Sequence, residues 1–382
     1  MARRPGLAVI YPNVPHLYLH IPFCARRCAY CDFSIAVRRR IPARQYVEAI
    51  RGELEMLEPA GALETLYLGG GTPSRLPADA VATLLQYVFQ RTPSRYEVEV
   101  TLEANPEDVT PDNAAAWREA GVNRVSLGTQ SFDDRVLQWM HRVHDAARAR
   151  DAVRTLRAAG FENLSLDLIF AVPAELERHW ARDLDEAVAL APEHLSLYGL
   201  TVEPRTPLAR WIARGAAAAP SDERYADEYL LAHERLSAAG YAFYEVSNAA
   251  RDGRRSRHNS AYWTGRPYTG AGPAAHSFDG RVRRWNLSAW ETYRRAITAG
   301  RSPVESEEIL SAEQQEMERV YLGLRTSDGL PLGSVRRRSP SLTAFVGKGW
   351  LVQRGGRLQC TVEGWLRLDA LVAALTGPVA TS

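Results

Sequence analysis

The stretch from Cys24 to Cys31 constrains this chain more than any other, because it carries three cysteines with the spacing C-x3-C-x2-C directly after the apolar run Leu17 to Ile21. Thiols gathered on one short loop are typical of a metal centre or an iron–sulfur cluster. The fourth cysteine, Cys360, lies far along the chain. The loop therefore supplies three ligands to a centre that accepts four. A [4Fe-4S] cluster bound in this way keeps one iron open, and an open iron can bind and reduce a small molecule.

Other interpretations of this loop are a structural zinc site completed by His20, a redox switch, or cysteines that are simply buried. The spacing resembles the signature of the radical S-adenosylmethionine (SAM) superfamily. The resemblance implies that the free iron of a [4Fe-4S] cluster chelates the amino and carboxylate groups of SAM, and that reductive cleavage releases a 5′-deoxyadenosyl radical. We prefer this interpretation because the rest of the chain agrees with it.

Length and composition indicate an ordered protein with more than one unit. The 382 residues are 46% hydrophobic and 24% charged, which predicts one large domain and a smaller one. Four cysteines, three of them in one loop, do not make a disulfide framework and suit a reducing cytosol. A formal net charge of +2 provides no global field for nucleic acid or a membrane surface. No signal peptide or membrane span is predicted, since the apolar run Leu7 to Tyr11 is too short for either.

The first half of the chain alternates between apolar strands and amphipathic helices. The predicted strands are Leu17 to Ile21, Thr65 to Leu68, Glu97 to Leu102, Arg124 to Leu127, Asn163 to Phe170 and His194 to Leu200. The predicted helices between them are Ala43 to Leu57, Ala78 to Phe89, Pro111 to Ala120, Ala146 to Ala159 and Trp180 to Leu190. Such units build a parallel sheet through right-handed crossovers. A doubly wound open sheet and a partial (β/α)6 TIM-type barrel both give this pattern, and the resemblance to radical SAM enzymes favours the α/β partial barrel.

In the rest of the chain the pattern of predicted helices and strands changes twice. Residues 206–286 are less regular, with a predicted helix Asp222 to Ala239 and a strand Tyr241 to Val246. From about Leu287 the pattern predicts helices Trp290 to Ala299, Ala312 to Leu324 and Leu342 to Gly349. A short pair of strands around Trp350 to Thr361 and a final helix Gly364 to Leu375 follow. We therefore expect a short lead (1–16), a barrel (17–205), an extension (206–286) and a small helical, winged-helix-like C-terminal domain (287–382).

Polar and glycine residues stand at or after the ends of successive predicted strands. Gly69, Gly70 and Gly71 would let the backbone approach a ligand, and Glu103 could accept hydrogen bonds from a ribose or an amino group. Further along the chain, Gln130, Arg142 and Asp167 offer an amide, a carboxylate-gripping cation and an anion. Each alone has a structural explanation, as a turn or a helix cap. Their succession after a cluster loop predicts one site at the carboxyl edge of the sheet, where barrel active sites lie.

A second unusual stretch runs from His258 to Trp263 and places a histidine beside two large aromatic side chains. This combination could serve as an axial haem ligand with rings that pack on the porphyrin. A hydrogen-bonded structural histidine is the commoner explanation when the stretch is considered alone. His276 is a rival ligand. No serine or cysteine stands in a nucleophile-elbow context, so covalent hydrolase chemistry is not supported.

These stretches together resemble the HemW branch of the oxygen-independent coproporphyrinogen oxidase family over nearly the whole chain. The His-Asn-x-x-Tyr-Trp stretch decides the branch, which is associated with haem binding, whereas the porphyrin-making dehydrogenases carry a further cysteine where this chain has Phe33. The matching stretches are Leu17 to Phe33, Gly69 to Ser74, Glu103 to Pro106, Gly121 to Asp134, Asn163 to Ile169, Ser196 to Glu203, Tyr244 to Asn248, His258 to Trp263 and Gly272 to Ser277.

The resemblance also implies roles for individual residues. Cys24, Cys28 and Cys31 would bind the cluster, and His258 would be the haem-site residue. The residues implied to surround SAM are Tyr18, Tyr30, Gly70, Gly71, Thr72 and Glu103, with Gln130, Arg142 and Asp167 as further contacts.

The functional hypothesis is a haem chaperone that binds a [4Fe-4S] cluster, SAM and haem and passes haem to acceptor proteins such as respiratory enzymes. It would need an electron donor for the cluster and would act in the cytoplasm, with peripheral membrane association and a homodimer left open. The enzyme alternative is a coproporphyrinogen III dehydrogenase that decarboxylates propionate side chains by radical chemistry. A third alternative is a radical SAM enzyme with another substrate, in which the His258 stretch is structural.

Overall fold

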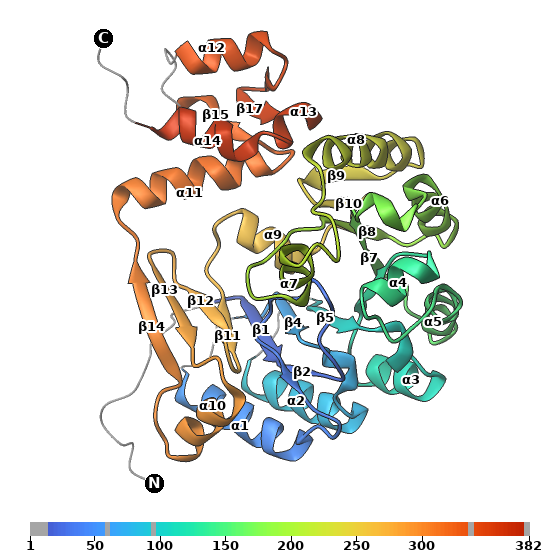
Figure 1. Ribbon diagram of the computed structural model, residues 1–382. Helices are drawn as coiled ribbons and strands as arrows, with labels where there is room; N and C mark the ends of the chain where they lie inside the picture. Colours follow the sequence, from blue (N-terminus) through green and yellow to red (C-terminus); the bar gives the residue numbers. More distant parts are fainter. Residues whose placement is uncertain (1–13, 58–61, 93–96, 335–339, 378–382) are drawn as a thin grey trace.

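The computed structural model describes residues 14–57, 62–92, 97–334 and 340–377 (Figure 1). Most of the predicted lead, residues 1–13, lies outside this part. Within the described residues, six parallel strands form the centre of a nine-stranded sheet and follow one another in chain order. They are β1 (His16–Ile21), β4 (Thr65–Gly70), β5 (Glu99–Ala104), β6 (Arg124–Gln130), β7 (Leu164–Phe170) and β8 (His194–Gly199).

Helices connect these strands and cover the outer side of the sheet. They are α1 (Ala43–Met56), α2 (Ala78–Arg91), α3 (Pro111–Glu119), α5 (Ala146–Ala158) and α6 (Trp180–Ala189). Figure 1 shows them one after another around the sheet. Because the strand order never reverses, the sheet is wound in one direction, and a doubly wound sheet is excluded. The predicted α/β partial barrel with six βα strands is therefore confirmed.

Three further strands extend the sheet at its edges. β11 (Thr269–Ala271) pairs in parallel with β1, while β10 (Asn248–Ala250) and β9 (Ala242–Glu245) are antiparallel additions beyond β8. The sequence predicted only β9, because the other two are three residues long and lie in stretches of small residues with no period to recognise. The short helices α4 (Asp134–Trp139), α7 (Pro207–Ala213) and α9 (Arg257–Trp263) were not predicted, whereas α8 (Asp222–Ala238) was.

A second sheet stands beside β11. It consists of β12 (His276–Phe278), β13 (Val282–Asn286) and β14 (Val304–Ile309), with α10 (Trp290–Thr298) between the last two. Trp290 of α10 packs edge to face on Phe23, with ring centroids 5.3 Å apart, which joins α10 to the barrel. The domain division expected at residue 287 stays a prediction, and this sheet crosses that position.

The chain ends in a helical unit that contains one small sheet. The unit begins with α11 (Ala312–Arg325), which is initiated by a capping box between Ser311 and Gln314. Its other helices are α12 (Pro340–Gly347), α13 (Val362–Trp365) and α14 (Leu368–Thr376), and its strands are β15 (Leu330–Pro331), β16 (Leu351–Arg354) and β17 (Arg357–Cys360). Figure 1 shows α11 running alongside the open end of the second sheet and over α9.

Candidate functional site

The carboxyl ends of the parallel strands and the cysteine loop surround a cavity of about 490 Å³, which we term the cysteine cavity. This cavity is lined by every residue that was predicted to hold the cluster or SAM, with the exception of Tyr18. His258, the predicted haem-site residue, does not line it either. Those that do are Cys24, Cys28, Tyr30, Cys31, Gly70, Gly71, Thr72, Glu103, Gln130, Arg142 and Asp167. Residues far apart in sequence therefore meet at the edge of the sheet where parallel strands place their ligand sites.

The cysteine loop is anchored by backbone hydrogen bonds rather than by a helix or a long strand. At its base, β2 (Phe23–Cys24) pairs with β3 (Ala36–Val37). Midway, the N–H of Ala29 donates to the carbonyl of Met140 (3.1 Å), and the N–H of Leu208 donates to the carbonyl of Ala29 (2.9 Å). These contacts fix the path of the loop across the mouth of the barrel.

The sulfur atoms have polar donors and open space beside them. The hydroxyl of Thr72 donates to Sγ of Cys24 (3.3 Å), and Nη1 of Arg142 donates to Sγ of Cys28 (3.5 Å). A Cβ atom on Gly71 would lie 2.7 Å from the carbonyl oxygen of Pro22 and 3.0 Å from Sγ of Cys24, so only glycine fits between this backbone and the sulfur. Donors that face sulfur stabilise a thiolate and tune a cluster bound to it.

Three thiols of one loop line the cavity, and such a donor set is able to hold a [4Fe-4S] cluster. Among the described residues, no group of three or more His, Cys, Asp or Glu side chains converges on one ion position. In a [4Fe-4S] cluster each thiolate binds a different iron, so its cysteines lie farther apart than the ligands of one zinc ion. His20 does not complete a zinc site, because its ring nitrogens contact the hydroxyl of Tyr18 (3.1 Å) and the carbonyl of Ser34 (3.2 Å). Burial raises the pKa of Cys31 to about 11, so binding of a cluster would release protons.

Glu103 stands at the end of β5 with its carboxylate held on two sides. The hydroxyl of Tyr67 donates to Oε1 (2.9 Å), and the N–H of Gly70 donates to Oε2 (3.0 Å). Burial raises the pKa of Glu103 to about 7, the nearby Asp167 adds to the rise, and the two hydrogen bonds oppose it. A cationic group in the cysteine cavity would therefore draw this carboxyl group into its charged form.

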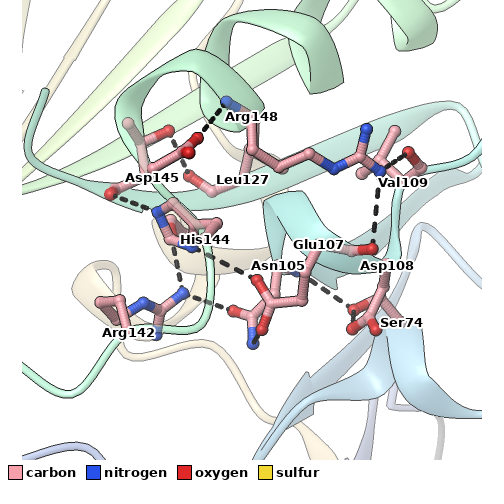
Figure 2. A network of polar contacts seen from close by, with 12 residues as sticks. Ser74, Asn105, Glu107, Asp108, Val109, Leu127, Arg142, His144, Asp145 and Arg148 are labelled. Carbon is pink, nitrogen blue, oxygen red and sulfur yellow. Dashed lines mark hydrogen bonds and ion pairs between the residues drawn. The ribbon is translucent and has the colours of Figure 1, made fainter. Parts of the chain in front are cut away.

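Arg142 reaches the same cavity from the loop after α4. Its Nη2 donates to Oδ1 of Asn105 (2.7 Å) and to the carbonyl of Gly128 (2.8 Å), as Figure 2 shows for Asn105. The N–H of Asn105 in turn donates to Oγ of Ser74 (3.1 Å), and Ser74 donates to Asp108 (2.7 Å). The guanidinium group is thus oriented by strand ends on either side of it.

A buried histidine lies behind Arg142 in the same network. His144 contacts Oε2 of Glu107 through Nδ1 (3.3 Å; Figure 2). Its Nε2 contacts the carbonyl of Thr129 (3.1 Å). Sequence reasoning missed Asn105, Glu107 and His144 as site residues. For Asn105 and Glu107 a signal existed, since both closely follow Glu103 at a strand end.

Asp167 and Gln130 complete this edge of the cavity. The hydroxyl of Ser126 donates to Oδ1 of Asp167 (3.0 Å), and burial raises the pKa of that carboxyl group. Gln130 has φ of 67°, and the pairing of β6 with β7 shifts register between Leu127 and Gln130. Such an irregularity redirects a side chain at the end of a strand.

His258 is 1% exposed, and both of its ring nitrogens are occupied. Nδ1 contacts the hydroxyl of Thr65 (2.7 Å), and Nε2 contacts the hydroxyl of Tyr262 (2.7 Å). Its backbone N–H donates to the carboxylate of Glu99 (2.9 Å), which fixes the start of α9. These contacts fit the structural alternative that the sequence left open, and the assignment of His258 to haem stays a prediction.

A second cavity, of about 730 Å³, lies among α9, the sheet β12–β13 and α11, and we term it the aromatic cavity. Tyr18 and His20 line it, so Tyr18 faces this cavity rather than the cysteine cavity. A Cβ atom on Gly70, which lines the cysteine cavity, would lie 2.7 Å from the ring of His20, which lines the aromatic cavity, so the two cavities come close to each other here. The remaining lining includes Tyr262, Trp263, Arg266, Tyr268, His276, Phe278, Arg283, Met317, Glu318 and Tyr321.

Comparison with known proteins places this geometry in a family. The radical SAM superfamily model matches residues 18–187, and the HemN C-terminal domain model matches residues 310–367. The chain is 42% identical to heme chaperone HemW of Mycobacterium tuberculosis, over 98% of this chain and 97% of that protein. The chain belongs to the HemW family. It is also 34% identical to HemW of Bacillus subtilis, over 82% of this chain and 84% of that protein. Its identity to HemW of Escherichia coli is 32%, over 93% of this chain and 96% of that protein.

A solved structure supports the fold of this HemW family member along almost its whole length. Coproporphyrinogen III oxidase HemN from Escherichia coli superposes with a TM-score of 0.80 at 22% identity, and the match covers 96% of this chain and 91% of that one. The barrel and the C-terminal unit thus share one arrangement with that enzyme. None of the helices in the described part of the chain combines the length and apolar character needed to cross a bilayer.

Proposed function

We propose that this protein is a haem chaperone, which binds a [4Fe-4S] cluster, SAM and haem and transfers the haem to acceptor proteins, with respiratory enzymes among them. The observation that carries the proposal is the 42% identity, over 98% of the chain, to a protein named heme chaperone HemW. Phe33 supports it, because this 63% exposed residue lines the cysteine cavity where porphyrin-making relatives have a further cysteine.

The residues of the cysteine cavity divide the work of holding the cofactors. Cys24, Cys28 and Cys31 would bind the cluster, which when present supplies low-potential electrons and one open iron. Arg142 offers a guanidinium group to a carboxylate, and Glu103 offers an acceptor to an amino or hydroxyl group. Both side chains are oriented before any ligand arrives, which lowers the entropy lost on binding.

The cellular setting follows from the same residues. A free, partly exposed cysteine loop needs a reducing compartment, so we place the protein in the cytoplasm, where an electron donor can reach the cluster. The exposed side chains beside the loop, Phe33 and Val143, are candidates for contact with that donor.

The test is anaerobic reconstitution with iron and sulfide, followed by titration with haem and with coproporphyrinogen III. Stoichiometric haem binding, passage of haem to an apo-acceptor and no vinyl porphyrin product are expected. Conversion of coproporphyrinogen coupled to release of 5′-deoxyadenosine would instead make the protein a dehydrogenase and overturn the proposal.

A further inference from the structure

The two histidines near the aromatic cavity differ in what their ring nitrogens can do. His258 is 1% exposed and uses both nitrogens in hydrogen bonds, whereas His276 is exposed, lines the cavity and has no ring hydrogen bond to any described residue. We propose that haem binds in the aromatic cavity with His276 as its iron ligand, while His258 is a positioning residue that acts through Tyr262. This inference rests on the proposed function and specifies its binding site.

The dimensions and walls of the cavity suit a flat aromatic ligand. Its volume of about 730 Å³ lies within the range of about 300–1,000 Å³ that is usual for ligand pockets. Aromatic rings of α9, of the segment before β11, of the second sheet and of α11 line it, and such rings pack on the faces of other π-systems. These rings belong to Tyr262, Trp263, Tyr268, Phe278 and Tyr321.

The imidazole of His276 is held in place without the use of its nitrogens. Its ring stacks on Trp285, the partner residue in the adjacent strand, with centroids 5.9 Å apart and an angle of 25° between the planes. Partial desolvation of the ring within the cavity and the neighbouring Arg283 lower the pKa of His276, so the ring is neutral at neutral pH and keeps a lone pair for a metal. Met317, 46% exposed on α11, lines the same cavity and offers a thioether as a second ligand.

Polar groups that could receive the haem propionates also line the cavity. Arg266 is a partly exposed cation whose guanidinium group is paired with Glu64 (2.8 Å) outside the lining. Nε1 of Trp263 is buried and has no hydrogen-bond partner among the described residues. Both cations have a carboxylate partner, but that of Arg283, Glu318 (2.9 Å), itself lines the cavity and would repel a propionate, whereas Glu64 does not line it. We therefore assign the propionates to the side of Arg266 and Trp263.

The contacts of His258 explain how a buried residue affects this cavity without touching the iron. Its Nε2 contacts the hydroxyl of Tyr262, whose ring is part of the cavity wall, while Thr65 holds the other nitrogen. Substitution of His258 would release Tyr262 and loosen the wall. The iron–imidazole bond would remain.

The experiment is a titration of ferric haem into the anaerobically reconstituted full-length protein, followed by magnetic circular dichroism and EPR to identify the ligand. His276→Ala is expected to lose the imidazole signature and to bind haem about tenfold more weakly, and free imidazole should restore the signature. His258→Gln, which keeps a group able to contact Tyr262, should retain imidazole ligation and bind within about tenfold of the wild type. His179→Ala, at the exposed N-cap of α6, is the matched control and should leave both readouts unchanged.

The outcomes separate this inference from the proposed function. Retained imidazole ligation in His276→Ala, or its loss in His258→Gln with iron content unchanged, would overturn the assignment while haem binding itself stands. A wild-type protein that binds no stoichiometric haem would refute the proposed function and this inference together. Far-UV circular dichroism and iron content of each variant show whether folding and cluster assembly are intact.

Discussion

At the scale of single residues, two glutamates have a pKa that is raised by burial but differ in what surrounds their carboxyl groups. Burial raises the pKa of both Glu53 and Glu103 to about 7. Glu53 accepts hydrogen bonds from the N–H of Gly272 (2.7 Å), Nδ2 of Asn286 (2.6 Å) and the hydroxyl of Tyr293, all within the protein. These bonds join α1 to the end of β11, to β13 and to α10. Glu103 lines the cysteine cavity, where we propose that it binds a ligand.

Glu103→Gln tests that distinction. The amide keeps the shape but cannot become an anion, so a charge-assisted hydrogen bond to SAM is lost, which is worth about 1.5–3 kcal/mol and about tenfold to a hundredfold in affinity. Anaerobic calorimetry on the reconstituted protein measures this, and the iron content should not change. Glu119→Gln, at an exposed position of α3, is the control. Unchanged SAM affinity in Glu103→Gln would remove Glu103 from the site.

Glu53 predicts a pH dependence of stability. Its pKa in the folded protein, about 7, exceeds the ordinary value of 4.5, so the folded state binds the proton more tightly than the unfolded chain. The stabilisation is complete below pH 4.5 and is lost as the pH rises to about 7, and a shift of this size corresponds to about 3 kcal/mol. In Glu53→Gln the free energy of unfolding should therefore fall less between about pH 5 and about pH 8 than in the wild type. Urea denaturation across that range checks this, and parallel wild-type and variant curves would contradict it.

At the scale of elements, the barrel strands and their helices were predictable because their hydrophobic period is local. The segments that complete the two cavities were not. β13 carries Arg283 and Arg284 and becomes a strand only through its pairing with β12 and β14. α4 and α9 are too short for a recognisable period. The tertiary fold, rather than local sequence, decides such segments.

The candidate site, too, could be predicted from the sequence only where its signal was local. The cysteine spacing and the strand-end residues could be read from the chain, and the structure gathers nearly all of them in one cavity. Pairs such as Arg142 with Asn105 or His258 with Thr65 depend on strands that lie far apart in sequence. The aromatic cavity is built from several separate elements, so no single stretch of sequence predicted it. Met317 and Tyr321, four residues apart on α11, do share one face of that helix.

At the scale of elements, substitution of Gly70 at the end of β4 tests how closely this strand packs against His20 of β1. Its φ is 116°, and a Cβ atom would lie 2.7 Å from the ring of His20, so Gly70→Ala adds backbone strain of about 1–3 kcal/mol and a collision. Gly160→Ala, at φ of 84° with nothing within 4 Å, carries the strain alone. We expect Gly70→Ala to lose more stability in urea than Gly160→Ala and to bind SAM more weakly. Equal losses of stability would show that His20 moves aside without cost.

At the scale of the whole molecule, the end of α11 joins the C-terminal unit to the barrel. Arg325 forms an ion pair with the fully buried carboxylate of Glu245, with an N–O distance of 2.6 Å. The same guanidinium group lies over the ring of Trp263, 4.2 Å from its centroid. Beside it, Nε1 of Trp365 donates to the carbonyl of Leu324 (3.0 Å). α11 is thereby fixed as the outer wall of the aromatic cavity.

Arg325→Ala should disturb both stability and haem binding. Removing one partner leaves the carboxylate of Glu245 buried and unpaired, which costs about 3–5 kcal/mol, whereas loss of an exposed pair costs less than about 1 kcal/mol. Arg235→Ala, which breaks the exposed pair with Asp185 (3.1 Å), is the matched control. Urea unfolding compares the two variants, and haem titration should show weaker binding only for Arg325→Ala. Similar unfolding midpoints for both variants would mean that solvent reaches Glu245.

The imidazole of His20 between the two cavities has a thermodynamic consequence. β1 lines the aromatic cavity through Tyr18 and His20, and its neighbour β4 lines the cysteine cavity through Gly70, so ligands in the two cavities would be separated by this pair of strands. Thermodynamic linkage makes such coupling reciprocal. If a ligand in one cavity changes the affinity of the other cavity for its ligand by some factor, the second ligand changes the affinity for the first by the same factor. If haem and SAM occupy these cavities as proposed, any effect of SAM on haem affinity must be matched by an equal effect of haem on SAM affinity.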